Sequence, residues 1–254
     1  MTTALGKGSQ RNSRNSLLAA LPEAEFQRLV PHLKVISVTS GEVLHASDEA
    51  ADSVYFLEEG VASLSVSTSE GKNLQLSIVG RESVVGERAI FKEGLFIVRC
   101  AMLTEGSGHS IPPTVFHQEF ERSEVLHDLV LSRIEARITE TAQTALCNQM
   151  HEMEQRLCRW LLTFADRLHS EELAITQQSI GDMLGVTRTE ISRTAGELRE
   201  RNLIEYSRGR LTIINRAGLQ DKACECYRVI KHAIKEFTSP GNKAAHNSSR
   251  LADI

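Results

Sequence analysis

The segment Ala174–Leu198 carries basic and hydroxyl side chains at helical spacing. Thr187 as the N-cap of a helix, with Glu190 three residues later, predicts a capping box. At about 100° per residue, three apolar side chains then face inward: Ile191, Ala195 and Leu198. The opposite face carries Arg188, Thr189, Ser192, Arg193 and Gly196. Guanidinium groups bind guanine edges and hydroxyls bind phosphates or base edges, so this face suits a DNA groove.

A second helix precedes this one and is separated from it by a tight turn. Gly181 allows the two helices to cross closely, and Gly185 supplies the turn, where we expect a positive φ. The predicted shared core consists of Ile180, Leu184, Ile191 and Leu198. The segment therefore predicts a helix-turn-helix.

A hairpin is expected over residues 203–214, with Arg208-Gly209-Arg210 at its tip. Such a tip forms a wing, and we expect Arg208 and Arg210 to contact backbone phosphates. Between residues 186 and 216, seven basic residues stand against four acidic ones, although the whole chain has a net charge of −4. This local excess indicates an anion contact. The alternative is a three-helix protein-interaction module with a solvated basic face.

Length and composition set broader limits. The 254 residues suggest one to two domains, and 41% hydrophobic with 24% charged residues exclude collagen, a long coiled coil and a wholly disordered chain. The five cysteines are odd in number and start at Cys100, which favours reduced thiols over a disulfide framework. No export signal or membrane span is apparent, so we expect a cytoplasmic protein without membrane contact.

Changes in composition along the sequence predict five parts of the chain. Residues 1–16 and 238–254 are expected to be disordered tails. Short apolar runs broken by glycines predict antiparallel strands within 17–117, including Val54–Leu57, Ala62–Ser67 and Leu74–Val79, with a hairpin turn at Glu70–Asn73. These form a small barrel or roll. A long helix over 118–147 follows, and then a DNA-binding domain over 148–237 that ends in a helix from about 216 to 237.

The long helix has a narrow apolar seam, and residues 116–147 contain neither glycine nor proline. The seam consists of Leu126, Val130, Ile134, Ile138, Thr141 and Ala145. Two interpretations remain: the seam packs on its own barrel, or it pairs with the same helix of a second subunit. We favour the second and expect these residues at a dimer interface.

From about residue 17 to 216, the layout resembles the cyclic AMP receptor protein and fumarate–nitrate regulator (Crp/Fnr) family of bacterial transcription factors. The motifs that carry the resemblance are Ser40–Leu44, Val54–Gly60, Val85–Phe91 and Gln178–Arg193. The resemblance implies an α+β fold: an N-terminal antiparallel β-roll of the cyclic-nucleotide-binding type, a dimerisation helix and a C-terminal winged helix-turn-helix.

The resemblance also implies roles for individual residues and partners. Arg188, Thr189, Ser192 and Arg193 occupy the family's base-reading positions. Members commonly have Glu where this chain has Thr189, so no operator sequence is assigned. The implied partners are a second copy of the chain, a pseudo-palindromic DNA operator and RNA polymerase.

The expected effector pocket departs from the family pattern. Gly86 and Glu87 match the nucleotide binders, but Ile97 and Val98 stand where a phosphate-binding Arg is expected. Only a longer loop would bring Arg99 into that role. Thr141 aligns with the family's adenine contact. An unpaired buried phosphate is costly, so we do not expect cyclic AMP to be required. The alternatives are a cyclic-nucleotide-responsive regulator of the same family and a nucleotide-binding regulatory protein that binds no DNA.

Other chemistries have weaker support. The family's N-terminal cysteine cluster is missing, so we expect no iron–sulfur cluster, and no spacing fixes a haem ligand pair among His109, His117 and His127. Cys224 and Cys226 would lie about 200° apart on one helix, so we expect no metal there. Cys147 and His151 could share a face, but the interdomain hinge is expected at about Asn148. No catalytic motif appears, so we expect no enzyme and identify no cofactor.

Overall fold

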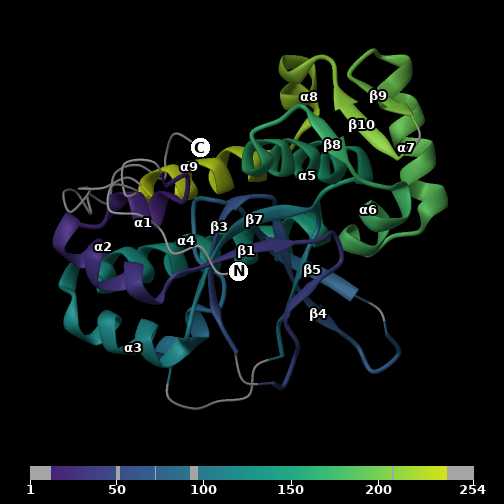
Figure 1. Cartoon of the computed structure of the whole chain (residues 1–254). Helices are drawn as coiled ribbons and strands as arrows, with labels where there is room; N and C mark the ends of the chain where they lie inside the picture. Colours follow the sequence, from purple (N-terminus) through teal and green to yellow (C-terminus); the bar gives the residue numbers. More distant parts are fainter. Residues whose placement is uncertain (1–12, 50–51, 72, 92–96, 208, 239–254) are drawn as a thin grey trace. The chain divides into compact units, whose positions relative to one another are not determined.

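A computed structural model describes residues 13–49, 52–71, 73–91, 97–207 and 209–238 (Figure 1). The chain divides into two compact units, residues 1–134 and 135–254, and the division falls within the helix Glu124–Met150. The tails that we expected to be disordered, residues 1–16 and 238–254, each include residues that belong to the folded part of the chain. Asn15 is buried and caps the first helix, and its side chain donates to the Leu57 and Ser83 carbonyls at 2.9 Å each. At the other end, the last helix runs to Thr238.

The first unit contains an antiparallel roll of two sheets (Figure 1). One sheet has the order β1-β7-β3 and the other β2-β6-β4-β5. The strands are β1 (Lys34–Val38), β2 (Val43–His45), β3 (Val54–Glu59), β4 (Ala62–Ser67), β5 (Asn73–Val79), β6 (Arg99–Met102) and β7 (Gly106–Ile111). The predicted strands and the β4–β5 hairpin are therefore confirmed.

Two apolar clusters stabilise this unit. The first fills the roll and includes Leu44, Leu57, Leu64 and Met102. The second joins the sheets to short helices and includes Phe26, Phe56 and Phe116. Those helices are α1 (Ser16–Ala20), α2 (Glu23–Leu29), η2 (Val30–His32), η3 (Glu87–Ile90) and α3 (Pro113–Arg122).

The prediction of one uninterrupted helix over residues 118–147 is wrong. The chain forms α3 and then a separate α4 (Glu124–Met150), because Ser123 leaves the helical conformation with φ −107° and ψ 110°. Its hydroxyl accepts a hydrogen bond from the Leu126 N–H at 2.9 Å, which caps the start of α4. α4 also continues past the expected hinge, and α5 begins only after Glu152.

The seam on α4 does not behave as one surface. Leu126 and Val130 are 2% and 0% exposed and belong to the core of their own unit, against which Ile134 also packs. Leu126 and Val130 therefore offer no surface to a partner, which corrects that part of the expected interface. Ile138 is 64% exposed, Ala145 is exposed and Thr141 is half-buried.

The second unit contains five further helices and three strands in its described part. They are α5 (Met153–Leu168), β8 (Glu172–Ala174), α6 (Gln177–Leu184), α7 (Arg188–Glu200), β9 (Ile204–Ser207), β10 (Arg210–Ile213), α8 (Arg216–Lys222) and α9 (Cys226–Thr238). The strands form an antiparallel sheet in the order β8-β10-β9. No helix within the described ranges is both long and apolar enough to cross a membrane.

A second helix prediction needs correction. The expected helix from 216 to 237 is broken into α8 and α9 by residues 223–225. Cys224 and Cys226 therefore do not share one regular helix, and both are buried, at 4% and 0% exposure. The break allows both thiols to point into the same interior, which regular helical spacing would forbid.

Candidate nucleic-acid interface

Helix α7 presents the polar face that the sequence predicts. Its N-cap is Thr187, whose Oγ1 accepts a hydrogen bond from the Glu190 N–H at 3.2 Å. Four side chains are buried beneath the helix: Ile191, Thr194, Ala195 and Leu198. Thr194 was not predicted among them. Four side chains are exposed on the other side: Arg188, Thr189, Ser192 and Arg193.

The turn between α6 and α7 depends on two glycines. Gly185 has φ +68°, in the left-handed region that L side chains rarely adopt. A Cβ on Gly181 would meet the Val186 carbonyl oxygen at 2.9 Å, so a side chain there would push the turn away. Arg156 of α5 donates to the Leu184 carbonyl at 2.6 Å and satisfies an acceptor at the end of α6. The predicted close crossing is confirmed.

The predicted wing is the β9–β10 hairpin. Tyr206 of β9 ties it to the helices, because its hydroxyl accepts from the Gln177 N–H at 3.1 Å and donates to the Ile175 carbonyl at 3.2 Å. Arg210 is exposed at the start of β10. Arg208, the other predicted phosphate contact, lies outside the described residues. The hairpin thus holds an exposed cation beside the helix-turn-helix.

The exposed residues Arg188, Thr189, Ser192 and Arg193 of α7 are called the recognition face below. The positive charge of this face is partly compensated within α7 itself. Arg193 Nη1 donates to Glu197 Oε1 at 2.7 Å, and the Arg193 side chain remains 62% exposed. A pair this exposed contributes at most about 0.5 kcal/mol, so the guanidinium is available to a stronger anion. Gly196 has open space above it, since a Cβ added there would have no neighbouring atom within 4 Å. This face could therefore approach a nucleic-acid surface closely.

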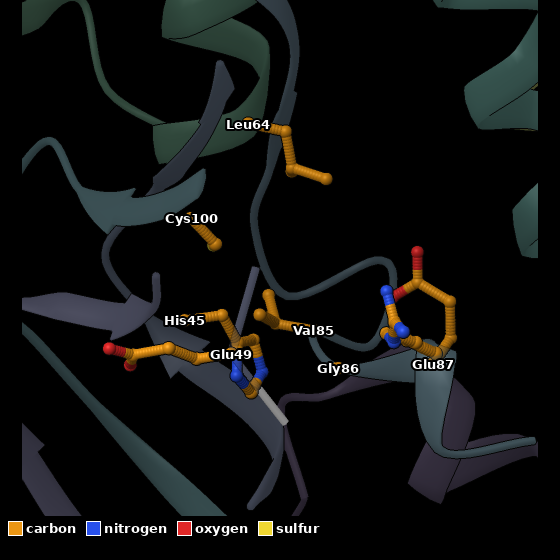
Figure 2. Close-up of a pocket in the computed structure, with 8 residues that line it drawn as sticks. His45, Glu49, Leu64, Val85, Gly86, Glu87 and Cys100 are labelled. Carbon is orange, nitrogen blue, oxygen red and sulfur yellow. The ribbon is translucent and has the colours of Figure 1, made fainter. Parts of the chain in front are cut away.

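The first unit holds a small pocket within the roll (Figure 2). It is lined by His45, Glu49, Leu64, Val85, Gly86, Glu87, Arg88 and Cys100. Its volume is about 10 Å³, which is roughly the space of one water molecule. Pockets that hold drug-sized ligands are far larger, about 300–1,000 Å³.

The pocket contains only part of the expected effector site. Gly86 and Glu87 line it, but Arg99 does not. The neighbouring Cys100 lines the pocket, and successive side chains of a strand point to opposite faces, so Arg99 of β6 points away. The cation in the lining is Arg88 instead. This residue was not predicted from the sequence, because the family pattern places the phosphate-binding Arg at about position 97. Thr141 lies on α4 in the other unit.

His45 is the unexpected group in this pocket. It is 8% exposed, and its Nε2 has no hydrogen-bond partner. Burial lowers the pKa of His45, and nearby Asp52 opposes that shift. A Cβ on Gly86, which has φ +89°, would meet His45 Nε2 at 2.7 Å. Figure 2 shows the imidazole beside Gly86, so the ring occupies space close to the Gly-Glu motif.

Two family models match separate parts of the chain. The cyclic nucleotide-binding domain matches residues 35–123, and the Crp-like helix-turn-helix domain matches residues 155–222. The first covers the roll and α3, and the second covers the helix-turn-helix with its wing. The two units thus define a regulator with a nucleotide-binding-type roll and a winged helix-turn-helix.

Whole-chain comparisons agree with these matches. A global nitrogen regulator from Synechococcus elongatus is 22% identical over 219 residues, which cover 83% of this chain and 98% of the relative. The cAMP-activated global transcriptional regulator CRP of Salmonella typhimurium is 22% identical over 68% of this chain and 86% of its own. The structure of FixK2 from Bradyrhizobium japonicum superposes with a TM-score of 0.65 at 17% identity, over 76% of this chain and 98% of that one.

The chain belongs to the Crp/Fnr family of transcription regulators. The predicted fold class is confirmed: an antiparallel roll, a long helix and a C-terminal helix-turn-helix domain. It is a DNA-binding transcription regulator, and its relatives are transcription regulators rather than enzymes.

Proposed function

We propose that this protein is a homodimeric, sequence-specific DNA-binding regulator that does not require cyclic AMP. The observation that carries the proposal is the α7 surface. Arg188, Thr189, Ser192 and Arg193 are exposed there, opposite a buried and mostly apolar face. Arg193 and Arg188 read base edges, and Arg210 on the wing contacts phosphate. By family resemblance, the bound dimer acts on RNA polymerase in the cytoplasm.

The exposed side chains of α4 support the dimer. Leu131 is 42% exposed and Ile138 64% exposed, and Ala142 and Ala145 are exposed further along the helix. Their spacing of seven, four and three residues places them on one stripe, as in paired helices. Small alanines allow a second helix to approach closely. A two-fold dimer would bind half-sites about 34 Å apart.

Binding to DNA is tested by selection from genomic fragments followed by gel-shift measurements at several salt concentrations. We expect enriched fragments to share a pseudo-palindrome and to bind about 10³-fold or more tightly than random DNA. Equal affinity for enriched and random fragments would contradict sequence-specific recognition.

Independence from cyclic AMP is supported by the charge and size of the roll pocket. Ile97, at the family's phosphate position, is 59% exposed, and Arg99 is not in the lining. Calorimetric titration with cyclic AMP should show no binding up to millimolar nucleotide, with operator binding intact. Micromolar binding that is lost in Arg99→Ala would overturn this part of the proposal. Micromolar binding lost in Arg88→Ala would do the same and would assign the phosphate to Arg88.

A further inference from the structure

Four metal-ligating side chains converge within the second unit, and none of them belongs to α7 or the wing. They are Cys147, His151, Cys224 and Cys226, and their ligand atoms all lie within 4.8 Å of one another. The three cysteines are buried at 0%, 4% and 0% exposure, and together they form a cluster of their own. Cys147 is in the last turn of α4, and Cys226 begins α9. Residues some 75 positions apart thus meet at one point.

The distances fit a single ion. Cys147 Sγ lies 3.5 Å from Cys224 Sγ, and Cys226 Sγ lies 3.5 Å from His151 Nδ1. Zinc in a tetrahedral site has bonds of about 2.3 Å to sulfur and 2.0–2.1 Å to nitrogen, which separates neighbouring ligand atoms by roughly 3.5–3.8 Å. An iron–sulfur cluster with two or four irons would hold the ligands of different irons farther apart.

The surroundings also match a metal site. His151 directs Nδ1 toward the cluster, while its Nε2 lies 3.3 Å from Glu225 Oε1. Metal-bound histidines generally donate their other ring N–H to such a carboxylate. Gln143 Nε2 donates to Cys226 Sγ at 3.1 Å. A donor to sulfur stabilises the thiolate form, in which cysteine binds metals.

We propose that Cys147, His151, Cys224 and Cys226 bind one zinc ion that fastens the end of α4 to the start of α9. A complete set of three sulfurs and one nitrogen leaves no open position, which is typical of a structural site. The ion would stabilise the DNA-binding unit without contacting the recognition face. The proposal does not depend on dimerisation or on a particular operator.

The first test is the metal content of the full-length protein, purified with reductant and without chelator. We expect elemental mass spectrometry to find about one zinc ion per chain. After removal of zinc, cobalt(II) should give the intense visible bands of a tetrahedral ion and sulfur-to-cobalt charge transfer. Added zinc should abolish both signals. Thermal unfolding should shift upward with zinc and downward with chelator.

Variants separate ligands from other cysteines. Cys147→Ser and Cys226→Ser should lose the cobalt charge-transfer signal in part and bind zinc far more weakly. Glu225→Gln should weaken zinc affinity about 10–100-fold, since it keeps every ligand but loses the carboxylate on His151. Cys158→Ala is the matched control, because Cys158 is a buried cysteine of the same unit outside the cluster. It should bind zinc like the parent protein.

Several results would overturn the zinc site. One is reduced wild-type protein that takes up neither zinc nor cobalt at micromolar ion. Another is iron with inorganic sulfide in place of zinc, which would indicate an iron–sulfur cluster. A metal-free protein with a Cys147–Cys224 disulfide would indicate a redox pair. Equal loss of zinc in Cys158→Ala and Cys226→Ser would show that the cluster is not the site. Gel shifts on the same preparations keep a failure of metal binding distinct from a failure of DNA binding.

Discussion

The α7 surface and the roll pocket differ in what they offer a ligand. On α7, cations and hydroxyls are exposed, and the buried side chains beneath them are nearly all apolar. In the roll, the Gly86-Glu87 motif is present, but His45 stands against it and only about 10 Å³ is open. The α7 surface thus presents the residue types of DNA recognition, whereas the roll pocket differs from the expected effector site because Arg99 is not in its lining. Proteins that share a fold can therefore differ in the ligand that the fold binds.

The largest expected effect concerns the stripe on α4. Ile138→Asp places a charge on an exposed apolar position, so the dimer should dissociate while each unit stays folded. DNA affinity should fall roughly 100-fold or more, because two half-sites no longer bind as one unit. Light scattering and fluorescence anisotropy measure the two effects. Ile97→Asp is a matched control, since Ile97 is 59% exposed on the roll. A dimeric Ile138→Asp protein would show that α4 does not form the interface.

The next effect is the loss of base reading on α7. Arg193→Ala should cost about 1–3 kcal/mol per half-site on the specific operator and much less on random DNA. Competition gel shifts give the ratio of the two affinities. Arg228→Ala removes the same charge from an exposed position on α9 and should leave the ratio unchanged. If Arg193→Ala still distinguishes operator from random DNA as well as the parent protein does, another face of α7 reads the operator.

A smaller effect is expected on the wing, and it should change the salt dependence of DNA binding rather than the preference for the operator. Arg210→Ala should weaken binding to all sequences alike and reduce the slope of log affinity against log salt by about one, because one phosphate contact is lost. The measurement is a salt series on operator and random DNA. If Arg210→Ala instead relaxes the choice of one base pair, the wing reads sequence as well as backbone.

The smallest effect lies in the roll and depends on pH. Burial lowers the pKa of His45, so the unfolded chain takes up a proton before the folded one as the pH falls. The stabilising contribution is present above the unfolded pKa of about 6.5 and is lost as the pH falls below it. His45→Gln should therefore lose less stability between pH 7 and 5 than the parent protein. Denaturant titrations at both pH values measure this, and identical losses would contradict it.

Local signals predicted the helix-turn-helix well. Spacing within a few residues was enough to predict Thr187 as the N-cap, the positive φ of Gly185 and the burial of Ile191 and Leu198. The β3, β4 and β5 strands were found for the same reason. The break at Ser123 was missed because no glycine or proline marks it, and a hydroxyl cap on the next helix decides it. The tertiary core, not the seam pattern, decided that Leu126 and Val130 are buried in their own unit.

The sequence by itself determined the order of elements, the family and the exposed face of α7, because helix and strand periodicity are local properties of the chain. Only the tertiary structure decided which distant side chains meet. Regular helical spacing separates Cys224 from Cys226 by about 200°, yet the break between α8 and α9 brings both to Cys147 and His151. Long-range packing likewise set His45 against Gly86 and turned Arg99 away from the pocket. Such contacts depend on how whole elements pack, which no short window of sequence specifies.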